Sequence, residues 1–265
     1  MNELEIQQAN RESWNETAAI HERAVMAELL EAVKAPDFCT FDAIEREEFE
    51  RIGLAGKAVV QLACNNAREL ISVKRAGAGR CVGFDISDAF VEQAHRLINS
   101  AQLDVQVVRS SIDDISDSYE GSFDVAYITI GALGWIPSLE RLCTKVARLL
   151  KKGGRLFVYE MHPVLFLYDE ETTDPSDPRI SRSYFRNEAL LFEGGQDYFD
   201  PDSSIESDCY WFQHTLGQII TNLLDAGFVI ERFSEYPHDI SNTHADFAKQ
   251  TNQLPMCFSL VAELK

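Results

Sequence analysis

Long apolar runs are absent from this sequence of 265 residues. A membrane-spanning helix needs roughly 18–20 consecutive apolar residues, and no stretch approaches that length. The opening residues, MNELEIQQANRESWNE, also lack the basic start and the apolar centre of a signal peptide. We therefore expect a cytoplasmic protein that makes no contact with membranes.

Positive charge is scarce. The chain has 24 Lys and Arg against 43 Asp and Glu, a formal net charge of −19. The excess lies in the flanks: residues 1–56 hold 13 acids and 5 bases, residues 57–161 hold 12 and 13, and residues 162–265 hold 18 and 6. Because such a surface repels phosphate backbones, nucleic acid is not an expected partner, and a small molecule is. The oligomeric state cannot be inferred from the composition.

Cysteines at metal-binding spacing are absent as well. No CxxC or HxxxH pattern occurs, and most of the six cysteines lie in apolar segments. A zinc site or a disulfide framework would need such clusters, so we expect reduced cysteines and no bound metal. They are Cys39, Cys64, Cys81, Cys143, Cys209 and Cys257.

The central segment, residues 57–161, alternates strand-like runs with helical periods. The runs are 57–63, 80–85, 105–110, 123–130 and 155–161. Since strands separated by helices run parallel with right-handed crossovers, the pattern predicts a doubly wound α/β sheet. Two more strands, 228–235 and 256–264, have no helical period between them and should pair antiparallel. We predict a mostly parallel seven-stranded sheet with an antiparallel last strand.

The flanks are expected to cover this sheet. Residues 1–56 are predicted to form an N-terminal helical lid, and residues 57–265 a Rossmann-like domain with a cap, 164–210, inserted after strand five. The cap holds 12 acids but also many aromatic side chains, which argues against disorder, and RSYFRNEALLFEGGQDYF indicates a hairpin around its two glycines. A merely solvated acidic face is the alternative.

The carboxyl ends of the strands are where ligands bind in such a sheet. Asp85 ends strand two, where an acid can accept both ribose hydroxyls; capping the next helix is the alternative. A GxGxG turn after strand one is missing, because Ala63, Asn65 and Ala67 occupy the three glycine positions. Alanine leaves little room for a pyrophosphate, so a dinucleotide is disfavoured, whereas a nucleoside with a carboxylate near the helix N-terminus fits.

Three stretches resemble class I S-adenosylmethionine-dependent methyltransferases. AVVQLACNNARELISVKRAGAGRCVGFDIS is similar to their first motif and acidic second strand, FDVAYITIGALGWIPSL to their fourth strand, and LLKKGGRLFVYE to their fifth. NRESWNETAAIHE near the start, and EMHP after strand five, resemble a bacterial subgroup with a degenerate glycine motif. The resemblance implies S-adenosyl-L-methionine as cofactor and methyl transfer to a small organic molecule.

The resemblance also implies cofactor contacts at the ends of four strands. They are Gln61, Ala63, Asn65, Asp85, Ile86, Ser111, Ile112, Thr129 and Ile130. The first three would line the methionine end, Asp85 the ribose, and the next three the adenine. Thr129 and Ile130 would close the site beneath the sulfonium. The family often has an acid where Ser111 stands.

Two histidines are candidates for the catalytic role. Trp14, Ala18 and His21 fall on one helical stripe that continues to Val25 and Leu29, so Trp14 and His21 either cover the cofactor, face the substrate or simply pack. His162 directly follows strand five and could deprotonate the acceptor, since imidazole titrates near neutral pH. Shaping the turn is its alternative role.

Two other functions compete with the methyltransferase hypothesis. A non-catalytic nucleoside-binding protein of the same fold would explain the missing glycines. A nicotinamide oxidoreductase is disfavoured by the antiparallel last strand and by the lack of a pyrophosphate turn.

Overall fold

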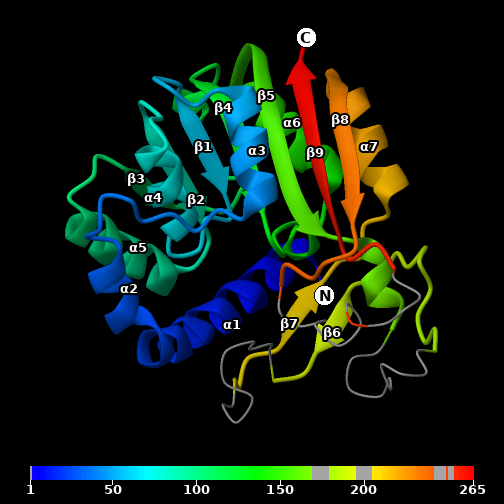
Figure 1. Ribbon diagram of the computed structural model, residues 1–265. Helices are drawn as coiled ribbons and strands as arrows, with labels where there is room; N and C mark the ends of the chain where they lie inside the picture. The colour runs from blue at the N-terminus through cyan, green and yellow to red at the C-terminus, as the bar shows by residue number, and fades with distance from the viewer. Residues whose placement is uncertain (1, 169–178, 195–204, 242–248, 250–253) are drawn as a thin grey trace.

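A mixed seven-stranded sheet forms the centre of the computed structural model, which describes residues 2–168, 179–194, 205–241, 249 and 254–265 (Figure 1). Its strands are β1 (Val59–Leu62), β2 (Cys81–Asp85), β3 (Gln106–Arg109), β4 (Phe123–Thr129), β5 (Leu150–Met161), β8 (Phe228–Tyr236) and β9 (Cys257–Leu264). Their spatial order is β3-β2-β1-β4-β5-β9-β8. Strand β9 runs antiparallel to both β5 and β8, while the first five strands pair parallel. The predicted sheet is confirmed.

Helices cover both faces of the sheet because neighbouring strand residues point to opposite sides. Val59 contributes to one core cluster and Val60 to the other. The first cluster receives α3 (Ala43–Ile52), α4 (Arg68–Arg75) and α5 (Asp88–Ala101), and the second receives α6 (Leu139–Leu149) and α7 (Leu216–Asp225). Figure 1 shows α3 in front of the sheet and α6 and α7 behind it.

The first helix takes a different place. Helix α1 (Glu3–Ala24) begins at a capping box of Asn2 and Glu5, and is followed by the short α2 (Met26–Ala32). In Figure 1, α1 passes below the ends at which the arrows of β1 and β5 point, which are the carboxyl ends of the parallel strands. Helix α3 packs on the sheet through Phe49, whereas α1 crosses the edge where a ligand is expected.

The start of β5 differs from the prediction. Helix α6 ends at Leu149 and β5 begins at Leu150, so KKGG lies inside the strand instead of before it. Phe123 pairs with Leu150, and the ladder resumes at Val125 and Arg155. The intervening residues are accommodated in a bulge, where Gly153 has a φ of 76°.

The cap contains a small antiparallel sheet. Strand β6 (Leu190–Phe192) pairs with β7 (Cys209–Trp211), after a short 3-10 helix, η3 (Pro163–Leu167). The hairpin predicted around the two glycines is corrected in part, because β6 pairs with a segment farther along the chain. Its expected second arm, 196–199, lies outside the described residues.

All six cysteines are free, and five of them are buried, as predicted for reduced core residues. In the parts of the chain that the structure describes, no helix is long and apolar enough to cross a membrane.

Candidate functional site

The turn after β1 has the backbone of a glycine turn without its glycines. Ala63, Asn65 and Ala67 have φ angles of 51°, 49° and 61°. A left-handed conformation costs a residue with a Cβ roughly 1–2 kcal/mol. Strain of this kind persists where a function or the surrounding structure requires the shape. The three positions at which a GxGxG turn would place glycine therefore all adopt the left-handed backbone that glycine favours.

Asp85 joins this turn to the start of α5. Its Oδ2 accepts the Asn65 N–H at 2.7 Å, and its Oδ1 accepts the Ser87 N–H at 2.9 Å. Burial raises the pKa of Asp85 to about 6, although these two N–H bonds act in the opposite direction. Each carboxylate oxygen accepts more than one hydrogen bond, so both can still receive a hydroxyl. Ser87, not Asp85, caps α5.

Beside Asp85, the end of β1 offers an unused acceptor. Gln61 is 1% exposed, and its Oε1 has no hydrogen-bond partner among the described residues. Helix α4 follows with Ala67 at its N-cap and no side-chain cap. An unpaired buried oxygen, a carboxylate and an uncapped helix start suit a nucleoside that carries an ammonium and a carboxylate group.

The loop after β3 contains an acid that sequence reasoning missed. Ser111 is buried, and its Oγ donates to Asp114 Oδ2 at 2.7 Å while accepting the Asp114 N–H at 3.2 Å. A carboxylate thus stands three residues beyond the position where the family often has one. The signal was present in the sequence SSIDDI, of which only the first residues were assigned.

The end of β4 is strained. Thr129 is buried, whereas Ile130 is 38% exposed and has a φ of 27°. For a β-branched residue this angle is a genuine outlier. The peptides that follow Ile130 are held by Glu160, at the end of β5.

Glu160 is the second residue that sequence reasoning missed. It is 3% exposed, and its carboxylate accepts the N–H groups of Gly131, Ala132, Leu133 and Met161. Burial raises its pKa, against the lowering effect of these bonds. Four donors occupy both oxygens, so Glu160 fixes the loop after β4 and is not available as a base. Nothing in the sequence separates it from other acids that end a strand.

Helix α1 is fastened to the start of α5. Asn15 Oδ1 accepts the Ser87 hydroxyl at 2.7 Å and the Ala89 N–H at 3.2 Å. Arg11 pairs with Asp88 at 2.5 Å and holds the pKa of that carboxyl below its usual range. These contacts place α1 directly over the helix that follows Asp85.

The same helix reaches the cap. Asn10 exchanges two hydrogen bonds with the backbone of Tyr210, from Nδ2 to the carbonyl at 2.9 Å and from the amide to Oδ1 at 2.7 Å. Trp14 packs edge-to-face on Phe90, with ring centroids 5.8 Å apart, and on Trp135, at 5.1 Å. The predicted stripe therefore faces the interior. The buried side of α1 includes polar residues as well as Ala18 and His21.

The two candidate histidines are both buried and packed against other side chains. His21 is buried with its ring edge-to-face on Phe90, at 5.0 Å between centroids. His162 is buried, its Nδ1 accepts the Val164 N–H at 3.1 Å, and its Nε2 lies 2.9 Å from Glu235 Oε1. Both ring nitrogens of His162 are therefore engaged, which favours the turn-shaping role over proton transfer.

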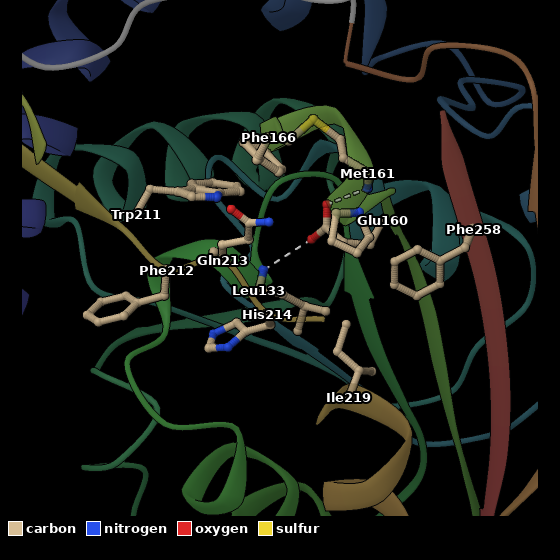
Figure 2. A pocket seen from close by; sticks show the side chains of 12 residues that line it. Leu133, Glu160, Met161, Phe166, Trp211, Phe212, Gln213, His214, Ile219 and Phe258 are labelled. Atoms are coloured by element: carbon tan, nitrogen blue, oxygen red, sulfur yellow. Dashed lines mark hydrogen bonds between the residues drawn. The ribbon is translucent and has the colours of Figure 1, made fainter. Parts of the chain in front are cut away.

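A small pocket of about 20 Å³, open to solvent on one side, lies between the sheet and the cap. We call it the cap pocket. Its twelve lining residues are Leu133, Gly134, Glu160, Met161, Pro163, Phe166, Trp211, Phe212, Gln213, His214, Ile219 and Phe258 (Figure 2). They come from the loop after β4, the end of β5, the cap, α7 and β9. Sequence reasoning named none of them, because they converge from distant segments.

Comparison with known proteins finds similarity to methyltransferases. Residues 59–154 match a family model described as a methyltransferase domain. The chain is 23% identical to an uncharacterized protein of Haemophilus influenzae, over 92% of this chain and 96% of that protein. It is 34% identical to a ubiquinone biosynthesis O-methyltransferase of Xanthomonas oryzae pv. oryzae, over 41% of this chain and 44% of that protein.

Solved structures share the fold. An S-adenosylmethionine dependent methyltransferase from Mesorhizobium loti superposes with a TM-score of 0.61 at 19% identity, over 83% of this chain and 98% of that one. Residues 59–154 thus match a methyltransferase domain, and the strand order is that of S-adenosylmethionine dependent methyltransferases of known structure.

Proposed function

We propose that this protein is an S-adenosylmethionine-dependent methyltransferase that methylates a small organic molecule at the cap pocket. The observation that carries the proposal is the position of the pocket: its wall includes Leu133, Gly134 and Glu160, and so borders the loop that leaves the end of β4. The pocket is small and partly open to solvent, which favours a small acceptor over a polymer.

On this proposal, the cofactor lies over the ends of β1, β2, β3 and β4. Gln61, Ala63 and Asn65 contact its methionine end, and Asp85 accepts the ribose hydroxyls. Ile86, Ser111 and Ile112 surround the adenine, and Thr129 and Ile130 close the site, with Trp14 above. S-adenosylmethionine would supply the methyl group from its cationic sulfur; an O–H or N–H acceptor would give up its proton to water as S-adenosylhomocysteine is formed.

The remaining work of the protein is alignment and exclusion of water. Helix α1 covers the edge of the sheet through Trp14, and Glu160 holds the loop between the two sites in one shape. We propose residues 1–24 as the lid, within the predicted segment 1–56, and Phe166 of the cap, together with residues 211–214 directly after it, as part of the wall of the acceptor pocket.

The experiment is a methyl-transfer screen over small-molecule acceptors that detects S-adenosylhomocysteine, with calorimetric titration of S-adenosylhomocysteine and of NAD alongside. We expect S-adenosylhomocysteine to bind and NAD not to bind. For any acceptor found, Gly134→Ala should abolish turnover, because a Cβ at 134 would lie 2.0 Å from the Trp211 ring. Leu224→Ala, on the exposed side of α7, is the control. Turnover that survives Gly134→Ala unchanged would place the acceptor elsewhere.

A further inference from the structure

The cap pocket is smaller than an organic acceptor. Its free space of about 20 Å³ is enough for one water molecule, which needs roughly 10–15 Å³. One wall is the segment from Trp211 to His214. The Trp211 ring packs directly on Gly134, whose carbonyl accepts the Phe212 N–H at 2.6 Å. An acceptor can therefore enter only if a wall moves.

Asn10 of α1 holds the strand that leads into this wall. It is 3% exposed, and its side chain bonds both backbone groups of Tyr210 in β7. A side-chain amide carries a donor and an acceptor, so it can pair with an edge residue as a neighbouring strand would. Since β6 pairs with the other edge of β7, Asn10 completes the pairing of β7 one residue before Trp211.

Glu16, farther along α1, holds the chain that enters β7. Its carboxylate accepts the Glu206 N–H at 2.7 Å, the Ser207 N–H at 3.4 Å and the Ser207 hydroxyl. Burial acts to raise the pKa of Glu16, but these bonds hold it below its ordinary value. The carboxylate is thus ionised at neutral pH, and hydrogen bonds to a charged acceptor are stronger than neutral ones. Two residues of α1 therefore bind the segment 206–210.

The opposite side of α1 is bonded to the proposed cofactor site. Helix α1 lies between α5 and β7 (Figure 1). Ser87 donates its N–H to Asp85 Oδ1 at 2.9 Å and its hydroxyl to Asn15 Oδ1 at 2.7 Å. Gln93 of α5 donates to the Ala18 carbonyl at 2.7 Å. A ribose bound by Asp85 would thus be in contact with groups that hold α1.

We infer that α1 couples the two sites, and that Asn10 and Glu16 are positioning residues that set the wall of the cap pocket according to whether the cofactor is bound. With the cofactor in place, α1 is held on α5 and keeps the segment 206–211 against the loop after β4. Without it, α1 and this segment separate from the loop more often, which opens the pocket. Closure over both ligands excludes water from the reaction. The inference rests on the proposed function, because it needs a cofactor at Asp85.

The test follows amide hydrogen exchange, residue by residue, in the full chain with and without S-adenosylhomocysteine. Two amides report the two sides of α1. Ala89 donates to Asn15 Oδ1 at 3.2 Å, and Phe212 donates to the Gly134 carbonyl. We expect saturating S-adenosylhomocysteine to slow the exchange of both amides by about fivefold or more, which is the lower end of typical coupling between sites.

Asn10→Ala separates the two sides. The slowing at Phe212 should fall to about twofold or less, whereas Ala89 should keep its slowing because Asn15 still binds α5. A merely structural Asn10 would instead speed exchange at Phe212 equally with and without ligand, which leaves the ratio of the two rates unchanged.

Two further variants complete the test. Glu16→Gln keeps the shape of the side chain, removes its charge and should also reduce the slowing at Phe212. It tests the same coupling if Asn10→Ala does not fold, which thermal unfolding shows. Glu12→Ala is the matched control, since Glu12 is exposed on the same helix and bonds Gln8 within it. This control should behave as the wild type.

Slowing at Ala89 that does not extend to Phe212 in the wild type would overturn the inference. Equal slowing at Phe212 in the wild type, Asn10→Ala and Glu16→Gln would also overturn it. Calorimetric titration with S-adenosylhomocysteine separates the two proposals: if this ligand binds and Phe212 does not respond, only the coupling fails. If it does not bind, the cofactor site is wrong and both proposals fail.

Discussion

Trp14 of α1 meets Trp135, in the short 3-10 helix after β4, edge-to-face with ring centroids 5.1 Å apart. Trp135 in turn meets Trp211 of the cap at 5.0 Å. The proposed lid, the loop after β4 and the proposed acceptor pocket are therefore in continuous contact. A movement of α1 would therefore displace the ring of Trp135, and with it the edge of the cap pocket.

The strained first turn should gain stability from the glycine that it lacks. Ala63→Gly removes a left-handed alanine, which costs roughly 1–2 kcal/mol, but adds the unfolded-state entropy of glycine, about 0.5–1 kcal/mol. We expect a free energy of unfolding that is unchanged or higher by up to about 1 kcal/mol. Ala147→Gly, inside α6, should instead lose about 1 kcal/mol. Urea unfolding decides, and equal losses in both variants would contradict the prediction.

Asp85 should control the affinity for the cofactor. Hydrogen bonds to a charged acceptor contribute roughly 1.5–3 kcal/mol, so Asp85→Ala should weaken S-adenosylhomocysteine binding by about one to two orders of magnitude. Because Asp85 also holds Asn65 and Ser87, Asp85→Asn, which keeps one acceptor oxygen, should lose less. Calorimetry measures both, with the exposed Glu92→Ala as control. Unchanged affinity in a folded Asp85→Ala would refute the assignment.

The attachment of α1 should matter for cofactor binding. Replacing Arg11 and Asn15 by Ala removes its bonds to the start of α5. We expect faster amide hydrogen exchange along α1 and about a tenfold lower affinity for S-adenosylhomocysteine, because a detached helix no longer covers the site. Arg23→Ala, at the exposed end of α1, should change neither quantity. Faster exchange with unaltered affinity would show that α1 is not a lid.

Stability should depend on pH through Glu45, which is 4% exposed and accepts the Tyr127 hydroxyl. Burial raises its pKa from 4.5 to about 7. The folded state then holds more protons than the unfolded chain between these values, so its contribution to stability falls as the pH rises from 4.5 to 7, by roughly 3 kcal/mol.

Glu45→Gln should abolish that contribution. The difference in unfolding free energy between wild type and Glu45→Gln isolates this contribution. Buried histidines such as His162 act in the opposite direction, but they do so equally in both proteins and cancel in the difference. Urea unfolding at several pH values measures this difference. As the pH increases, the wild type should lose stability relative to the variant. A difference that is constant over this window would disprove the protonation of Glu45.

His162→Ala tests the role of the histidine after β5. Its loss leaves the Val164 N–H without a partner, which should lower stability by about 1–3 kcal/mol, with similar modest losses in turnover and cofactor affinity. The pH profile of turnover should keep its shape. A loss of turnover of about 100-fold or more, with cofactor affinity intact, would instead support proton transfer by His162.

The strands of the fold were predictable because each is a short apolar run between polar turns, and the crossover helices fixed their direction. The start of β5 was not, since KKGG normally ends a helix and here occupies a bulge set by pairing with β4. Strand β6 pairs with β7, whose partner choice depends on side chains such as Trp211 that pack on distant segments.

The candidate site, like the fold, could be predicted from the sequence only in part. Spacing from strand one was enough to select Asp85 and the three turn positions. Glu160 could not be identified from spacing, because its importance comes from hydrogen bonds to four backbone amides that the sequence does not reveal. Trp211 ends the three-residue strand β7 and Gln213 follows it, and so short an element has no periodicity that indicates which side chains face inward.

Because the Trp211 indole packs directly on Gly134, these two positions also depend on one another in evolution. A Cβ at 134 and a large ring at 211 exclude one another, and the Gly134 carbonyl accepts the Phe212 N–H at 2.6 Å from the adjoining strand. Among related chains, a side chain at position 134 should therefore occur only with a small residue at position 211. Such paired changes would mark lineages in which the wall of the cap pocket has a different shape.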